Sequence, residues 1–255
     1  MKTKISCVLI VYNEENNLHR SLDSVKWCDE IVVVDSGSTD KTLDICKEFG
    51  CKIFHKNFDG FGEQKRFAVS KAVNDWILNI DADEVVSDKL REEIENNLNS
   101  EDLDVKGFFI PRSLIFLGRK FNYGRECKEY FLRLFNKTYG NFTSDKVHEK
   151  VDISGNTQKL KGQLLHYSYD NIDQYFQKFN SYTTKAAETL LANGSKGRNV
   201  LVIVLGFPVY FIKNYFIYRN FLNGMPGFLW ALFSSLYPMV KYLKLWALRK
   251  GYHQY

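Results

Sequence analysis

The sequence predicts an α/β fold in which a mostly parallel, Rossmann-like sheet is flanked by helices. Strand-like and helix-like segments alternate four times between Lys4 and Asn79. The strand-like segments are near-continuous apolar runs, as expected of strands that are covered on both faces. Such an alternation requires right-handed crossovers between parallel strands. The strand-like segments that follow lack this rhythm, so we expect them to continue the same sheet in a mixed arrangement.

The first four strands are expected at Lys4–Val11, Ile31–Val34, Lys52–His55 and from Trp76 onward. Helices should lie between them and after them. Apolar residues recur at helical spacing after Asn13, which is a candidate N-cap. The remaining helices of this half are expected from the loop Asp35–Asp40 to Gly50, from Gly62 to Val73, and from Ser87 to Asn99.

The second half changes in character. Short strands are expected at Gly107–Pro111, Phe131–Phe135 and Leu160–Tyr167, followed by an amphipathic helix from Asn171 to Gly194. We therefore divide the chain into a first domain at residues 1–194, with halves at 1–100 and 101–194, and a tail at 195–255.

Length and composition limit the class of protein and its cellular setting. A chain of 255 residues with 45% hydrophobic content can bury a proper core. Its five cysteines form no CxxC pair, which is typical of reduced thiols in a cytoplasmic setting. No long apolar signal core follows the N-terminus, so we do not expect a cleaved signal peptide.

Three carboxylates, Asp81, Asp83 and Glu84, directly follow the fourth strand. Like charges this close repel each other, so a folded protein should supply a compensating cation, and oxygen ligands suit Mg²⁺ or Mn²⁺. The alternative is an exposed acidic turn whose Glu84 opens the next helix. Tyr12 and Asp35 also fall at carboxyl ends of predicted parallel strands, where ligands bind in such sheets, and this favours a site.

The tail is basic and aromatic. All 30 acidic residues of the chain lie before residue 189, whereas residues 189–255 carry eight Lys and Arg. Two stretches, 199–212 and 220–240, are uncharged; the first is too short for a simple membrane span, and the second contains a Pro-Gly break. This composition favours helices lying on an anionic membrane surface. A packed hairpin, a homo-oligomer interface and a spanning hairpin are the alternatives, and no nucleic-acid binding is expected.

Several motifs occur in a recognisable order: Val8–Glu15, Val32–Asp40, Asp81–Asp83, Phe58–Lys65 and Lys146–Glu149. Together they resemble the family 2 glycosyltransferases of the GT-A fold, and within them the branch of lipopolysaccharide core β-1,4-glucosyltransferases. The resemblance covers roughly residues 4–190. It implies a GT-A sheet whose 1–100 half binds a nucleotide sugar and whose 101–194 half faces the acceptor.

The resemblance also implies residue roles. The donor-binding residues would be Tyr12, Asn13, Glu14, Asp35, Lys65, Arg66 and Asp81. The first three would line the base and ribose pocket, and Asp35 would hydrogen-bond the base or the ribose. Lys65 and Arg66 could add positive charge near the phosphates, although related proteins often have Asn in place of Arg66; the alternative is a solvated helix face.

The Asp81–Asp83 pair matches the DxD signature of the family. The resemblance implies that Asp83 binds Mg²⁺ or Mn²⁺ and that Asp81 contacts the ribose or a metal-bound water. His166 ends an apolar strand and could be a further ligand, or else a hydrogen-bonded core histidine. A cation in this place would offset the charge that develops on a diphosphate leaving group.

Glu149 matches the position of the candidate base in this branch, and a carboxylate suits a hydroxyl that becomes acidic only in the transition state. The alternative is a surface glutamate, and His148 could orient it or be structural.

We therefore predict an inverting transfer of a hexose from UDP-glucose or another UDP-hexose. The acceptor would be a lipid-linked saccharide such as lipopolysaccharide core, and the enzyme peripheral or monotopic at the cytoplasmic face of the inner membrane. An inactive nucleotide-sugar-binding or scaffold protein and a nucleotidyltransferase are the alternatives.

Overall fold

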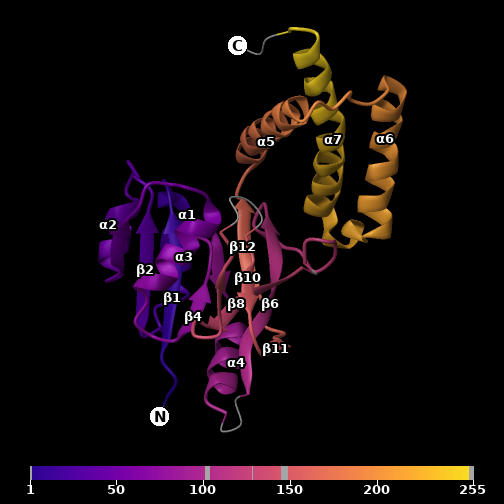
Figure 1. Cartoon of the computed structure of the whole chain (residues 1–255). Coiled ribbons are helices and arrows are strands. Elements are labelled where there is room, and N and C mark those ends of the chain that lie inside the picture. Colours follow the sequence, from indigo (N-terminus) through magenta and orange to yellow (C-terminus); the bar gives the residue numbers. More distant parts are fainter. Residues whose placement is uncertain (1, 101–103, 128, 145–148, 253–255) are drawn as a thin grey trace. The chain divides into compact units, whose positions relative to one another are not determined.

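The computed structural model describes residues 2–100, 104–127, 129–144 and 149–252 of the chain. It divides into two compact units (Figure 1). Unit 1 comprises Met1–Ser113 and Lys128–Tyr167, and unit 2 comprises Leu114–Cys127 and Ser168–Tyr255.

The first half of the sheet in unit 1 is parallel, as predicted. Its strands are β1 (Ile5–Val11), β2 (Glu30–Asp35), β3 (Lys52–His55) and β4 (Trp76–Asn79), and they lie in the order β3-β2-β1-β4. Val11 at the end of β1 pairs with Asp35 at the end of β2. The loops that follow these two strands therefore leave the same edge of the sheet.

The sheet continues in a mixed arrangement, which confirms the predicted fold class. Beyond β4 the order is β8-β6-β12-β5, with β8 antiparallel to both β4 and β6 and with β5 antiparallel to β12. The additional strands are β5 (Glu84–Val86), β6 (Val105–Phe116), β7 (Arg119–Lys120), β8 (Tyr130–Asn136), β9 (Gly140–Phe142), β10 (Val151–Ile153), β11 (Asn156–Lys159) and β12 (Leu164–Tyr169). Strands β7 and β11 pair with β6, and β9 pairs with β10 in a separate small sheet.

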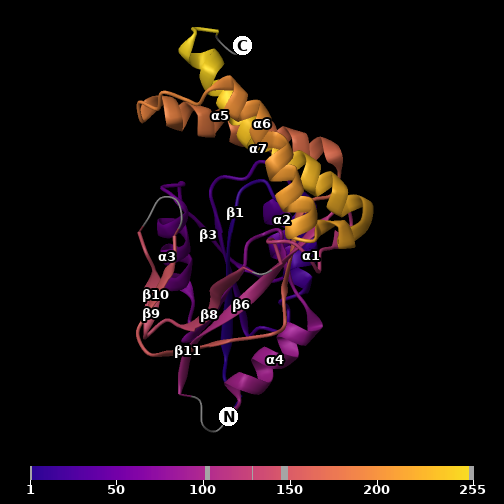
Figure 2. The same cartoon turned by 90° about the vertical axis from the view of Figure 1, so that its right-hand side faces the viewer.

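Helices cover both faces of this sheet because successive residues of a strand point to opposite sides. Cys7 and Leu9 of β1 belong to the core that includes residues of α1 (Glu15–Asp23), α2 (Thr42–Glu48) and α4 (Asp88–Leu98). Val8 points the other way, into the core shared with α3 (Phe61–Lys71). Figure 2 shows α3 and α4 on opposite sides of the strands. The five cysteines are all free thiols.

Asn13 is not the N-cap of α1, contrary to the sequence-based expectation. The capping position is Glu14, and Asn13 has a positive φ of 55°. The Asn13 backbone N–H donates to Ser38 Oγ (2.9 Å), and its side-chain oxygen accepts from the Thr39 N–H (2.8 Å). Asparagine tolerates this left-handed conformation, so its side chain is directed to the neighbouring loop rather than to its own helix.

Unit 2 is built from helices around an aromatic cluster. Its helices are α5 (Ile172–Ala192), α6 (Val200–Ile212), which continues as a π-helical turn (Lys213–Ile217), a 3₁₀ turn (Asn220–Asn223) and α7 (Gly224–Arg249). Phe116, Tyr175 and Trp230 meet edge to face in the cluster. The predicted domain boundary after residue 194 lies inside this unit, because α5 packs against α7 (Figure 1).

The tail helices are longer than the first uncharged stretch and the Pro-Gly break in the second indicated. Helix α6 runs without a break into the π-helical turn, so Val200–Ile217 is a stretch of 18 residues, long and apolar enough to cross a membrane by length and composition. Pro226 lies in the first turn of α7, where a missing N–H breaks no helical bond, so the Pro-Gly pair does not interrupt the helix.

The chain packs tightly around Gly162, and substitutions at this glycine and at Gly107 test how closely unit 1 is packed. A Cβ at this position would lie 2.3 Å from the Leu90 Cα, whereas a Cβ at Gly107 would meet only the ends of the Ile153 and Leu132 side chains. Backbone cannot move aside as a side chain can, so we expect Gly162→Ala to lower the free energy of unfolding by about 3 kcal/mol and Gly107→Ala by about 1 kcal/mol. Urea titration measures both, and equal losses would contradict this account.

Candidate active site

Asp35 organises one edge of the candidate site. It ends β2, is almost fully buried, and accepts hydrogen bonds from the Gly37 N–H (2.8 Å) and the Ser38 N–H (3.1 Å). Burial alone would raise the pKa of Asp35, but the hydrogen bonds from Ser38 and Gly37 outweigh it and lower the pKa. Asp35 therefore remains charged and fixes the loop after β2.

The loop after β1 lies against the loop after β2. The Glu14 N–H donates to Thr42 Oγ1 (2.8 Å), and Asn13 makes the two contacts with residues 38 and 39 described above. Tyr12 stays 59% exposed at the end of β1. The structure thus brings Tyr12, Asn13, Glu14 and Asp35 together at one edge of the sheet and leaves the Tyr12 ring accessible to a ligand.

The acidic turn between β4 and β5 is a closed structure. Glu84 starts β5 instead of opening the next helix, which begins at Asp88 with Ser87 as its N-cap. The Glu84 N–H donates to the Asp81 carbonyl, and the Glu84 carboxylate accepts from the Asp81 N–H, both at 2.9 Å. Glu84 is fully buried. The alternative of an exposed acidic turn is therefore wrong for Glu84.

Arg133 of β8 supplies the compensating cation for this turn. Its Nη2 lies 2.7 Å from Asp81 Oδ2 and 2.8 Å from Glu84 Oε1, and its Nη1 donates to Asn79 Oδ1 at 2.8 Å. The Arg133 side chain is 8% exposed. The acids follow β4, and β8 is its antiparallel neighbour, so strand pairing alone brings the guanidinium to the carboxylates.

Lys65 of α3 joins the same turn to Glu149. Its ammonium lies 3.0 Å from Asp81 Oδ1 and 2.8 Å from Glu149 Oε1, with the Lys65 side chain only 6% exposed. Both Asp81 oxygens therefore bind a cationic side chain. Lys65 and Arg133 offset much of the negative charge that the sequence places here, before any metal ion is considered.

These ion pairs shift the carboxyl groups in opposite directions. Burial would raise the pKa of Asp81, but the charges of Arg133 and Lys65 outweigh it and hold the pKa well below its ordinary value. The pKa of Glu84 is raised, chiefly by burial, because Arg133 only partly offsets that cost and the Asp81 charge adds to it. Asp81 is therefore the firmly ionised member of the turn.

Arg66 does not join this cluster. Its guanidinium donates to the Phe142 carbonyl (2.8 Å) and lies 3.8 Å from Glu63 on the same helix. This arrangement matches the predicted alternative of a solvated helix face more closely than a phosphate contact. His148 and Asp145, which precede the candidate base Glu149 in the sequence, lie outside the described residues.

Asp83 and His166 face each other beside the turn. Asp83 Oδ2 lies 3.1 Å from His166 Nε2, and their side chains are 21% and 23% exposed. Strand pairing sets this contact: His166 stands opposite Glu84 in the β5–β12 pair, and the Tyr167 N–H donates to the Asp83 carbonyl. The two side chains form a partly exposed oxygen–nitrogen pair, which fits a divalent cation whose remaining ligands come from a diphosphate or water. Among the described residues, no group of three or more His, Cys, Asp or Glu is placed to hold a metal.

Arg133 and Asn79 are not among the site residues predicted from the sequence. The available signal was a lone arginine between two leucines of the apolar strand Phe131–Phe135. An arginine in that setting is buried only if a carboxylate meets it. The sequence does not reveal which carboxylate, because β8 pairs with β4 across a long separation in the chain.

The shifted pKa of Asp81 predicts a pH-dependent contribution to stability. A depressed pKa stabilises the fold above the unfolded pKa, near 3.8, and this stabilisation is lost as the pH falls through the folded pKa. We expect the loss of stability caused by Asp81→Asn, measured by urea titration, to be largest at neutral pH and to shrink below about pH 4.

Glu84→Gln is the matched control, because the Glu84 pKa is shifted upward. The wild type should lose stability relative to Glu84→Gln as the pH rises above 4.5 toward the folded pKa. The same pH trend in both variants would contradict the assigned ion pairs.

The sequence of this chain is similar to those of known glycosyltransferases. The family model for glycosyl transferase family 2 matches residues 6–154. An uncharacterized glycosyltransferase of Rickettsia typhi is 36% identical over 97% of this chain and 87% of its own length. The lipopolysaccharide core biosynthesis glycosyltransferase LpsC of Rhizobium meliloti is 30% identical over 96% of this chain and 93% of its own.

Among solved structures, the crystal structure of S. aureus TarS 1-349 is similar in fold, with a TM-score of 0.50 and 15% identity over 99% of this chain and 93% of that one. The region matched by the family model, residues 6–154, contains nearly all of β1, together with β2, the acidic turn, Arg133 and Glu149. The chain therefore belongs to glycosyl transferase family 2, with a GT-A-like mixed sheet.

Proposed function

We propose that this glycosyltransferase moves a hexose from a UDP-sugar, with UDP-glucose the first choice, to a lipid-anchored saccharide, with inversion at the anomeric carbon. One observation carries the proposal. Glu149, a carboxylate able to take a proton, is tied through one buried ammonium to the acidic turn that carries Asp83. The candidate base is thus joined through Lys65 to the turn that carries the metal candidate Asp83.

The donor is proposed to bind along the loops after β1 and β2. Tyr12 offers an exposed ring for a base, and the backbone contacts of Asn13 and Glu14 hold the two loops in register. Asp35 acts mainly through the loop that it fixes, because both of its oxygens accept backbone N–H groups. Lys65 is proposed to add positive charge near the diphosphate, because its ammonium lies 3.0 Å from Asp81 Oδ1 in the turn that carries Asp83.

Asp83 and His166 are the residues that would hold Mg²⁺ or Mn²⁺. The nitrogen ligand suits Mn²⁺ better than Mg²⁺, because Mg²⁺ is bound mostly through oxygen. When bound, the cation would stabilise the negative charge of the departing nucleoside diphosphate. Asp81 is less suited to a direct metal bond, because Lys65 and Arg133 already bind its oxygens.

Glu149 is proposed as the general base. The acceptor hydroxyl oxygen forms a bond to the anomeric carbon while the bond from that carbon to the donor phosphate oxygen breaks, and the hydroxyl proton passes to Glu149. Lys65 donates to one Glu149 oxygen at 2.8 Å and so orients the carboxylate, and the second oxygen is the one proposed to take the proton. Attack on the face opposite the leaving group inverts the configuration.

A lipopolysaccharide core sugar is the first choice of acceptor, supported by the similarity to LpsC over nearly the whole chain. The tail fits a lipid-anchored acceptor because its 18-residue apolar helical stretch is only 6% buried and its charged residues are all basic. These properties support a location on the cytoplasmic face of the inner membrane, where nucleotide sugars are available.

Removing the Asp83 carboxylate tests the metal assignment. Asp83→Asn should abolish transfer and remove the metal dependence of nucleotide binding, because an amide is a much weaker ligand for a divalent cation. Nucleotide binding measured by calorimetry with and without Mn²⁺ reads out the second effect.

Asp23→Asn, on the surface of α1, is the matched control and should keep both properties. Full wild-type transfer after exhaustive chelation would overturn the metal proposal.

Glu149→Gln tests the base. The amide keeps the shape and can still accept from Lys65, but it cannot take the proton. Donor affinity should hold, while turnover should fall by about 10²–10⁴-fold.

Glu63→Gln is the matched control. Glu63 lies two residues before Lys65 in α3, so this variant makes the same chemical change without altering Glu149 and should leave turnover unchanged. Near-normal turnover in Glu149→Gln would move the base elsewhere, with Asp145 the next candidate.

A further inference from the structure

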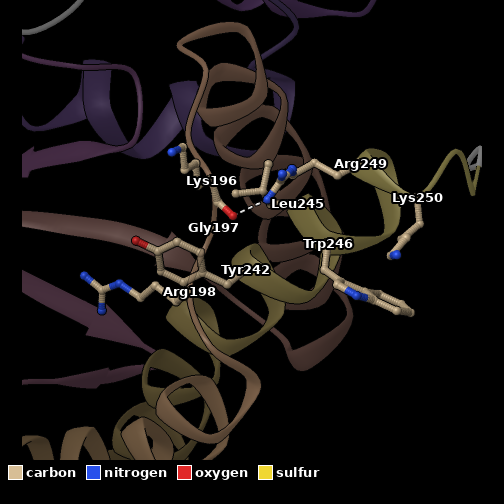
Figure 3. Close-up of a pocket in the computed structure, with 8 residues that line it drawn as sticks. All are labelled: Lys196, Gly197, Arg198, Tyr242, Leu245, Trp246, Arg249 and Lys250. Atoms are coloured by element: carbon tan, nitrogen blue, oxygen red, sulfur yellow. Dashed lines mark hydrogen bonds between the residues drawn. The ribbon is translucent and has the colours of Figure 1, made fainter.

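A cavity in unit 2 has no part in the transfer reaction described above. Its volume is about 340 Å³, and it lies where the segment before α6 meets the last turns of α7 (Figure 3). Its lining includes four cationic side chains and two aromatic ones: Lys196, Arg198, Arg249, Lys250, Tyr242 and Trp246.

Two of the four cations are held in place by the fold. The Arg249 guanidinium donates to the Lys196 carbonyl, which ties the end of α7 to the segment before α6 (Figure 3). The Arg198 guanidinium lies 4.8 Å from the centre of the Tyr242 ring, a cation–π contact. Buried Leu245 supports the cavity from α7. The positive charges are thus gathered by structure and not only by composition.

No Asp or Glu side chain is among the described residues that line this cavity. Four like charges around one cavity repel each other, and residues 189–255 contain no Asp or Glu. A ligand from outside that carries negative charge would relieve the repulsion. Arginine binds phosphate oxygens with two parallel hydrogen bonds, and lysine adds a point charge, so a phosphate suits this lining.

The neighbouring residues indicate where such a phosphate comes from. The apolar stretch Val200–Ile217 begins two residues after Arg198, and only 6% of it is buried. At the same end, Trp246 is 49% exposed and packs against Tyr252, with ring centres 5.7 Å apart. Aromatic rings and basic residues at the end of an apolar helix are typical of the level of lipid headgroups.

We propose that this cavity binds the phosphate of an anionic phospholipid headgroup. The proposal rests on the proposed membrane association, but it does not depend on the sugar-transfer reaction. It replaces a diffuse attraction between the basic tail and the membrane by a defined site at one end of the α6–α7 pair.

The test compares two double variants of the full chain. Arg198→Gln/Lys250→Gln removes two charges from the cavity, and Lys213→Gln/Arg219→Gln removes two equally exposed charges between α6 and α7, away from it. Binding is measured to phosphatidylcholine vesicles with and without phosphatidylglycerol. We expect the cavity variant to bind the anionic vesicles about 30-fold more weakly, and the control to stay within about 3-fold of the wild type.

Three further measurements separate the possible causes. Arg198→Lys/Lys250→Arg should retain binding, and thermal unfolding of every variant checks that the fold is intact. Inorganic phosphate, followed through the fluorescence of the chain, should not reach the affinity of the anionic vesicles. Equal losses in the two Gln variants, or equally tight binding of inorganic phosphate, would overturn the proposed site.

The vesicles without phosphatidylglycerol separate the site from membrane association as such. Wild-type binding to these vesicles that is as tight as to the anionic ones would remove the site and leave membrane association standing. Binding to neither kind of vesicle would overturn both, while transfer to a soluble acceptor would still be governed by Asp83 and Glu149.

Discussion

Five side chains of alternating charge, Glu149, Lys65, Asp81, Arg133 and Glu84, hold the candidate active site in one arrangement. Each internal member of this chain contacts two partners of opposite sign. Burying charged side chains is costly unless every charge is paired. Removing one partner leaves another buried charge uncompensated, at a cost of about 3–5 kcal/mol. The position of the acidic turn is therefore coupled to the position of the candidate base.

The same coupling sets a condition on donor binding. Two carboxylates share the Lys65 ammonium. In the proposed donor complex, a diphosphate near Lys65 would compete with Asp81 and Glu149 for that charge. Arg133 keeps Asp81 compensated when Lys65 is drawn toward a phosphate, because it binds the other Asp81 oxygen. Arg133 thus has a structural role, and under the proposed function it would leave Lys65 available to a phosphate.

Much of the fold was predictable because most of its strands correspond to short apolar runs that can be recognised locally in the sequence. Short apolar runs such as Ile31–Val34, bounded by polar loops, are typical of strands covered on both faces, and their alternation with helices predicts a parallel sheet. The short exposed strand β11 carries no such run, and β5 is only three residues long, so neither was predicted. The proline-based reading of the tail also failed, because Pro226 falls in the first turn of a helix, where proline is tolerated.

The site was predictable in part, for a related reason. Asp35 ends β2, and Asp81 and Asp83 come shortly after β4, so the ends of the strands indicate where these carboxylates lie. Arg133 meets its partners only through the pairing of β8 with β4, and Glu84 is buried only because β5 joins the sheet. Contacts of this kind depend on long-range register, which a single sequence does not reveal.

The pairing of β5 with β12 bears on how enzymes of this kind diversify. The spacing of Asp83 and His166 is set by strand register and not by the length of chain that separates them. Surface loops within that intervening chain can gain or lose residues while this pair stays in place. If Asp83 and His166 hold the metal as proposed, a new acceptor specificity can arise by insertion or deletion in these loops while the metal site keeps its geometry.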